Sequence, residues 1–183
     1  WSGGGLGVWN GSSGTVTGCT FTGNHAGDTG GGVSCVYTST LELESCLIAS
    51  SSADKGGGMV VAHGSVVTGD RVTVANNAGA WGGAMNIAYE GSAVNMTNAT
   101  FYKNGGSAGN IIVLQSYCTM ANSIVAFGLE GSAFSYGSPT LTCCNLYGNF
   151  ALGTGAGQMG INGNIEEDPL FHDAENLNFH LED

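Results

Sequence analysis

Basic residues are scarce in this chain of 183 residues, which has 3 Lys and Arg against 14 Asp and Glu and a formal net charge of −11. Binding to a phosphate backbone draws its affinity from Lys and Arg side chains that displace counterions. Nucleic acid is therefore excluded as a partner. Long apolar runs are also missing, since none approaches the roughly 20 residues that a membrane-spanning helix needs. The sequence predicts no transmembrane segment.

Charged residues of both signs make up only 9% of the chain, whereas hydrophobic residues make up 42%. Disordered segments show the opposite balance, so we expect the chain to fold. Proline is rare as well, with 2 residues against 33 glycines. The glycines do not recur at every third position, which excludes a collagen-like structure.

Glycine clusters recur along the chain and open at Gly3, Gly30, Gly56, Gly82 and Gly109, which are 27, 26, 26 and 27 residues apart. Each cluster is followed by a short apolar run, a turn of small residues and a second run that alternates between apolar and polar residues. A fixed period of this size indicates supersecondary units that stack on one another. Helical units are disfavoured, because glycine costs about 1 kcal/mol in a helix interior.

Alignment of the units produces columns of like residues, and apolar columns alternate with polar ones as expected for strands. The columns predicted to face the interior are Leu6, Val33, Met59, Met85, Ile111; Val8, Cys35, Val61, Ile87, Val113; Val16, Leu43, Gly69, Met96, Met120, Leu141; Cys19, Cys46, Val72, Ala99, Ser123, Cys144; and Phe21, Ile48, Val74, Phe101, Val125, Leu146. Two polar columns, which begin at Thr15 and Thr17, are predicted to face solvent.

These columns predict an all-β fold, a right-handed parallel β-helix (solenoid) of about six to seven coils with a period of 21–27 residues. Each strand is expected to pair with its equivalent one coil away. Residues 1–183 form a single domain, with repeated coils over 1–149 and a terminal coil and cap over 150–183. A further column predicts a hydrogen-bonded ladder at a corner where Asn tolerates a left-handed backbone: Asn24, Ser51, Asn77, Asn104, Gly128, Asn149.

Two short motifs carry a resemblance to a known family. Gly82 to Met85 reads Gly-Gly-Ala-Met, and both Phe21 to Asn24 and Phe101 to Asn104 read Phe-x-x-Asn. Over about residues 3 to 149 they resemble the Gly-Gly-Ala-Ile and Phe-x-x-Asn repeats of the polymorphic outer-membrane protein family. The tail from Asn164 to Leu181 is similar to the closing coil of secreted bacterial β-helix proteins. The resemblance implies a secreted or surface-exposed protein with an adhesive or structural role.

Glu42, Glu44 and Asp70 are the strongest candidates for a chemical site, because the alignment places them on one exposed face of adjacent coils, beside Arg71. β-Helix polysaccharide lyases use such a face, with acidic residues that hold Ca²⁺ and a Lys or Arg that removes a proton. Calcium takes six to eight oxygen ligands, and these three residues supply only part of that set. An ordinary solvated face is the other interpretation, and on it we expect no catalytic residue and no cofactor.

Three further chemistries have weaker support. Glycoside hydrolysis needs two carboxyl groups roughly 5 to 9 Å apart, and Glu44 and Asp70 could provide them, but their Thr neighbours do not provide the environment of a general acid. Ice binding would need regular Thr-x-Thr rows, which Glu42 and Asp70 interrupt. The four histidines, which are His25, His63, His172 and His180, occupy different positions in their coils, so no metal-binding set emerges.

Six cysteines are present. Cys19 and Cys46 share an inward column one coil apart, which brings their Cα atoms to roughly 4.8 Å, within the range for a disulfide. We predict that they form a disulfide, with stacking as small apolar side chains as the alternative. The pairing of Cys35, Cys118, Cys143 and Cys144 is left open.

Three Asn-x-Ser/Thr sequons begin at Asn10, Asn95 and Asn98, and each is expected to be exposed. Sequons and cysteines together favour an oxidising, extracellular setting, with these asparagines as glycosylation candidates. Because no convergent catalytic set is found, we predict a secreted or cell-surface structural or adhesive protein. The alternatives are a Ca²⁺-dependent polysaccharide lyase that uses Glu42, Glu44 and Asp70, and a glycan-binding module.

The front of the chain predicts self-association. The first glycine cluster follows within five residues of Trp1, so no amphipathic segment covers the first coil. Uncovered strand edges recruit other strands, and solenoids need polar terminal caps. We therefore expect either that more protein precedes Trp1 or that the open end docks on another subunit, head to tail, which propagates into a filament.

Overall fold

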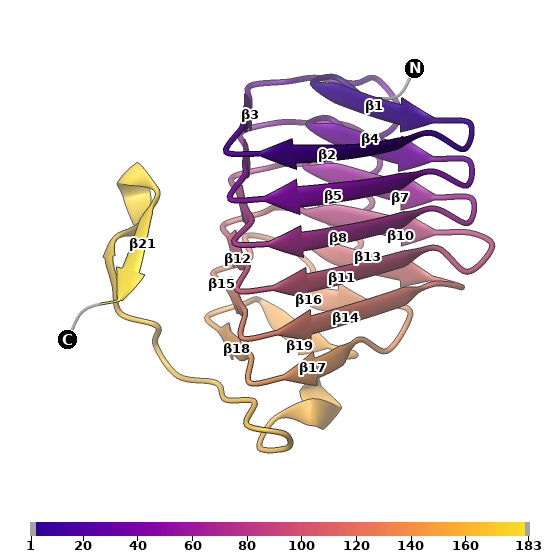
Figure 1. The fold of residues 1–183 in the computed structure, drawn as a ribbon. Helices are drawn as coiled ribbons and strands as arrows, with labels where there is room; N and C mark the ends of the chain where they lie inside the picture. Colours follow the sequence, from indigo (N-terminus) through magenta and orange to yellow (C-terminus); the bar gives the residue numbers. More distant parts are fainter. Residues whose placement is uncertain (1–2, 182–183) are drawn as a thin grey trace.

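The structure is a computed structural model that describes residues 3–181, and it shows coils stacked on one another around a common axis (Figure 1). Trp1, Ser2, Glu182 and Asp183 lie outside the described residues. The expectation about the chain before Trp1 therefore also lies outside what the structure describes. Each coil contributes one strand to each of three parallel sheets. The predicted parallel β-helix is therefore confirmed.

The first sheet has seven strands, which are β1 (Leu6–Trp9), β4 (Val33–Val36), β7 (Met59–Ala62), β10 (Met85–Ala88), β13 (Ile111–Leu114), β16 (Ser132–Ser135) and β19 (Ala151–Gly153). The second has six, which are β2 (Ser13–Thr17), β5 (Thr40–Glu44), β8 (Val66–Asp70), β11 (Ala93–Thr97), β14 (Tyr117–Ala121) and β17 (Thr140–Thr142). The third also has six, which are β3 (Thr20–Thr22), β6 (Leu47–Ala49), β9 (Thr73–Ala75), β12 (Thr100–Tyr102), β15 (Ile124–Ala126) and β18 (Asn145–Tyr147). Six to seven strands per sheet agree with the predicted number of coils.

The strand register matches the predicted columns. Met96 pairs with Gly69 on one side and Met120 on the other, and Phe101 lies between Val74 and Val125. These side chains fill one continuous core in which Phe101 is 2% exposed. The outward column beside them, which includes Glu42 and Asn95, is exposed. Period-2 alternation therefore fixed both the register and the buried face of the second and third sheets.

The corner between the second and third sheets has a left-handed backbone in every coil, at Gly18, Ser45, Arg71, Asn98, Asn122 and Cys143. At the next corner the left-handed residue immediately precedes the predicted ladder column, as at Asn76, which precedes Asn77, and Lys103, which precedes Asn104. The expectation that the ladder asparagines themselves adopt this conformation was wrong. They are kept in place by their side-chain hydrogen bonds instead.

The ladder itself is present and buried. The Asn77 side chain donates to the Ile48 carbonyl (2.9 Å) and to Asn104 Oδ1 (3.0 Å), and its own Oδ1 accepts from the Ser51 backbone N–H (2.9 Å). The side chains therefore bind the backbone of the preceding coil as well as one another. Gly128 interrupts the column because the Asn110 side chain fills the space, where a Cβ on Gly128 would lie 2.1 Å from Asn110 Nδ2.

The C-terminal end of the solenoid is closed by residues 151–165. Strand β19 extends the first sheet, and the short 3₁₀ helix η1 (Ala156–Gln158) crosses the end of the stack. Gln158 Oε1 accepts from the Leu141 N–H (2.9 Å), and the buried Asn164 accepts from the Cys144 N–H (2.9 Å) and donates to the Leu141 carbonyl (3.0 Å). These side chains satisfy backbone groups of the last coil, as a polar cap must.

The rest of the tail is not a further coil. Strands β20 (Phe171–Asp173) and β21 (Asn178–Leu181), joined by the 3₁₀ helix η2 (Ala174–Asn176), form an antiparallel hairpin that lies beside the third sheet (Figure 1). The rings of Phe171 and Phe179 pack edge-to-face on Tyr102, at 5.9 and 5.1 Å between ring centroids. Glu175 pairs with Lys103 at the same place. The hairpin thus docks by aromatic packing and one ion pair.

Candidate functional site

The predicted acidic face on the second sheet is a network of ion pairs. Arg71 Nη2 lies 2.6 Å from Glu44 Oε1, and Arg71 Nη1 also binds Asp70. Asp70 further accepts from Asn98 Nδ2 (2.7 Å), and Glu42 accepts from the Thr15 hydroxyl (3.2 Å). The carboxylates of Glu44 and Asp70 are thus brought together, but around a guanidinium group.

This arrangement does not fit a calcium site or a lyase. Two of the three predicted ligands already bind one cation, and the Arg71 that would act as the base is held in the same ion pairs. No group of three or more His, Cys, Asp or Glu side chains within residues 3–181 is arranged to hold a metal ion. The hollows over this sheet are lined only by residues of its own strands, so they are parts of an exposed strand face.

The outer face of the first sheet is different, because it is covered. Every residue of β4, β7 and β10 is buried, including those that point away from the core. Val36, Val60 and Ala62 form a second apolar cluster on this outer side, with exposures of 6%, 3% and 4%. The glycine loops that precede the strands fold back over the sheet, and Gly30 comes so close that an added Cβ would lie 3.0 Å from the Val60 side chain.

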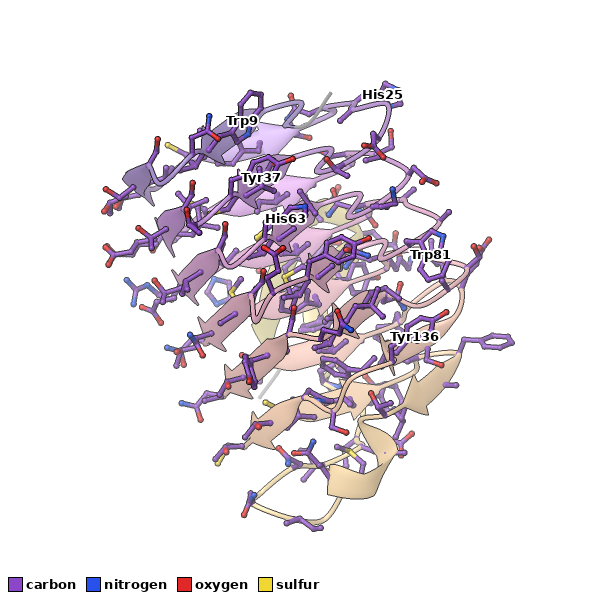
Figure 2. All side chains as sticks on the ribbon, turned by 90° about the vertical axis from the view of Figure 1, so that its right-hand side faces the viewer. Trp9, His25, Tyr37, His63, Trp81 and Tyr136 are labelled. Atoms are coloured by element: carbon purple, nitrogen blue, oxygen red, sulfur yellow. The ribbon has the colours of Figure 1, made fainter. Side chains whose placement is uncertain are left out.

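Between these loops and the opposite corner lies a cleft of about 320 Å³, with Val36, Val60, Ala62 and the buried Asn86 as its floor. Its first wall is a column of three rings from the turns that follow β4, β7 and β10. Tyr37 stacks on His63 at 4.8 Å between ring centroids, and His63 stacks on Tyr89 at 5.1 Å. All three residues have positive φ angles, which turn the chain sharply at the end of each strand. Figure 2 shows Tyr37 and His63 one below the other on this side of the sheet.

The second wall is built by the loops. Thr29, Lys55 and Trp81 occupy equivalent positions on successive coils and are joined by parallel bridges. Asp28 Oδ1 lies 3.2 Å from Lys55 Nζ, and this hydrogen bond raises the pKa of Lys55. On the next coil along this wall, Trp81 stacks on Tyr136 at 5.7 Å between ring centroids, and Figure 2 shows both to the right of Tyr37 and His63. The cleft is therefore a trough that runs along the solenoid axis.

The three basic side chains of the chain are all paired. Lys55 binds Asp28, Arg71 binds Glu44 and Asp70, and Lys103 binds Glu175. The cleft consequently offers hydroxyl, amide and ring-edge groups above an apolar floor, and its one ammonium group is neutralised. Cavities of this size, with an apolar floor and a few polar groups, are typical of small-molecule sites.

The other predicted residues are distributed over the surface and the core. Asn10, Asn95 and Asn98 are all exposed, as expected. Cys19 and Cys46 lie at equivalent places on adjacent coils and are free thiols in this structure, so a disulfide between them stays a prediction. Burial raises the pKa of Cys35 to about 11 and that of Cys118 to about 12, so both thiols are protonated at neutral pH.

The family described as right handed beta helix region matches residues 4–166, nearly the whole solenoid. The chain belongs to this family. No curated protein sequence matches it significantly. Among solved structures it has a 12% identical counterpart in QnrB1, a plasmid-mediated fluoroquinolone resistance protein, over 90% of this chain and 93% of that one. The TM-score of 0.27 is too low for that likeness to support any inference.

Sequence analysis of this β-helix missed the cleft, although two signals pointed to it. The strands of the first sheet are mostly apolar, as in Met59–Ala62, and strands that are buried on both faces show such runs. Tyr37 and Tyr89 also occupy the same turn position two coils apart. The acidic candidates lie on the exposed face of the second sheet, whereas His63 belongs to a wall of the cleft.

Proposed function

We propose that this β-helix is an adhesive, carbohydrate-binding protein that takes its ligand in the cleft on the outer face of the first sheet. The observation that carries the proposal is the combination of a mainly apolar floor, which also holds the Asn86 amide, with walls of tyrosine, histidine and threonine groups and the Asp28–Lys55 pair. Hydroxyl-rich sugar rings present apolar CH faces and polar edges, and the cleft is complementary to both. The ligand needs no catalytic group from the protein.

Other classes of ligand fit less well. A peptide that adds a strand needs a free sheet edge, whereas the strands of this face run across the trough and pair with the neighbouring coils. A polyphosphate needs free cations, and all three basic side chains are paired. Carbohydrate recognition uses side-chain hydrogen bonds, which is what both walls supply.

We further propose a secreted or cell-surface location, which would suit this role. The three sequon asparagines are exposed, which leaves them accessible to glycosylation if the chain enters a secretory pathway. The motif resemblance to polymorphic outer-membrane proteins points to the same setting. No helix within residues 3–181 is long and apolar enough to cross a membrane.

Affinity electrophoresis in gels that contain cellulose derivatives, xylan, mannan or pectin tests the proposal. We expect at least one polysaccharide to retard the protein. The double variant Tyr37→Asn, Tyr89→Gln should abolish retardation. The chain already carries Asn10 and Gln115 at the equivalent turn positions of other coils, so both replacements suit the backbone.

The matched control is Tyr117→Asn, which removes an exposed tyrosine (67% exposed) from the second sheet, outside the cleft. It should migrate in every gel as the unmodified protein does. If no polysaccharide retards the protein, or if the control variant loses binding as strongly as the double variant, the proposal is wrong.

Self-association through the coil ends is a second proposal, favoured by the state of the first coil. Cys19 is exposed in the first coil, whereas Cys46, the next residue in the same column, is 2% exposed. Phe21 is likewise only half-buried, whereas Phe101 in the same column is 2% exposed. A second copy that docks on the first coil would cover these groups. Light scattering at micromolar concentration should show species larger than a monomer, and a monodisperse monomer would overturn this proposal.

A further inference from the structure

We infer that the ligand of the cleft is an uncharged, linear oligosaccharide that lies parallel to the solenoid axis and contacts three successive coils. This inference rests on the proposed carbohydrate-binding function and specifies its ligand. It follows from three properties of the cleft, which are the repetition of its walls, the way its rings are stacked and the cancellation of its charges.

Repetition sets the direction of the ligand. Tyr37, His63 and Tyr89 present one ring per coil, and the ring centroids are spaced by 4.8 and 5.1 Å along the axis. A sugar ring in an extended polysaccharide advances the chain by a closely similar length, so consecutive sugars can meet equivalent wall positions. The opposite wall repeats with the same coil spacing, at Thr29 and Lys55.

Ring stacking decides what the wall offers to a sugar. The planes of Tyr37 and His63 are 10° apart, and those of His63 and Tyr89 are 21° apart, so both faces of the histidine ring are covered by its neighbours. The wall therefore presents ring edges with their hydroxyl and nitrogen groups, and the sugar ring is left to pack on the apolar floor of Val36, Val60 and Ala62. Each sugar can then form hydrogen bonds with the ring edges of the wall and pack on the apolar floor, and this pattern can repeat once per sugar.

Charge decides the class of sugar. The Lys55 ammonium group that lines the cleft is paired with Asp28, so it is not free to bind a carboxylate. The Glu90 carboxylate lies 3.7 Å from His63 Nδ1 at the edge of the same wall, and it would repel an anion. The chain as a whole has a formal net charge of −11, and a negative electric field lowers the local concentration of acidic polymers. Neutral sugars meet no such barrier.

Isothermal titration with neutral oligosaccharides of increasing length, from the xylan, glucan and mannan series, tests the inference beside oligogalacturonates of the same lengths. We expect affinity for the neutral series to rise with each added sugar until about three are bound, and then to level off. The oligogalacturonates should bind about tenfold more weakly at low salt, and the gap should narrow as salt screens the repulsion. Tighter binding of the acidic series, or affinity that does not depend on length, would overturn the inference.

The variant Asp28→Asn sharpens the test because it leaves Lys55 unpaired without changing the shape of the wall. The ratio of oligogalacturonate affinity to neutral affinity should rise about two- to fivefold, the factor expected for one exposed charge pair. An unchanged ratio contradicts the role assigned to the Asp28–Lys55 pair.

The outcomes separate the inference from the function beneath it. If an acidic oligosaccharide binds best and the Tyr37→Asn, Tyr89→Gln variant abolishes that binding, the cleft is a carbohydrate site and the inference about its ligand is wrong. If neither series binds at any length, both the inference and the proposed function fail.

Discussion

Replacement of Asn77 by alanine tests the buried ladder most directly. Asn77 is 1% exposed, and its side chain makes three hydrogen bonds, to the Ser51 N–H, the Ile48 carbonyl and Asn104 Oδ1. The substitution removes all three and leaves two backbone groups of the preceding coil without this partner. A buried polar group left unsatisfied costs roughly 1 to 3 kcal/mol. We therefore expect the free energy of unfolding to fall by about 3 to 5 kcal/mol.

Urea unfolding followed by circular dichroism measures this loss as a shift of the midpoint at constant slope. The matched control is Asn24→Ala in the same column of the first coil. Asn24 is half-buried, and its side chain makes no hydrogen bond to the residues that the structure describes, so the cost should stay below about 1 kcal/mol. Equal losses for the two variants would show that the ladder does not stabilise the coils.

Three further predictions follow from burial and charge. Phe101→Ala should lower the free energy of unfolding by about 3 to 5 kcal/mol, because Phe101 is 2% exposed and removal of its ring leaves a cavity. Thr100→Ala beside it should change the free energy of unfolding little in the same urea assay. Under reducing conditions, iodoacetamide should label the exposed Cys143 in the native protein. Cys118 should be labelled only after unfolding, because burial raises the pKa of its thiol to about 12, and labelling of Cys118 in the native protein would contradict its burial. The hydrogen bond from Lys103 lowers the pKa of Glu175 below its ordinary 4.5, so hairpin docking is stabilised above that value and weakens as pH falls through the lower folded value. Hydrogen-exchange protection factors of the hairpin amides, which correct for the pH dependence of intrinsic exchange, should fall in acid for the unmodified protein, and Glu175→Gln should lack this step.

The acidic face shows where prediction from sequence stopped. The alignment correctly placed Glu44 and Asp70 on adjacent coils, because strand register follows from the alternating pattern. It did not reveal that Arg71, at the following corner, turns back to bind both carboxylates. The direction of a side chain at a corner depends on the local backbone, here a φ of 52°, which the column pattern does not encode.

The C-terminal tail had no repeat from which to predict its place. Residues 151–165 close the stack, as expected for a cap, but the hairpin of β20 and β21 lies against Tyr102 and Lys103, about 70 residues earlier in the sequence. Contacts at such separation are made by side chains outside any column. Periodicity therefore could not predict them.

The sequence by itself determined the parallel β-helix, its register and its buried columns, because each coil repeats the same pattern and packs on a copy of itself. Only the tertiary structure decided which outer surface is hollowed. The cleft arises where glycine loops from one part of each coil fold over strands from another and face the Tyr37, His63 and Tyr89 rings across them. That juxtaposition depends on how each loop curves back in space, and residues that share no column in the sequence become the two walls of one site.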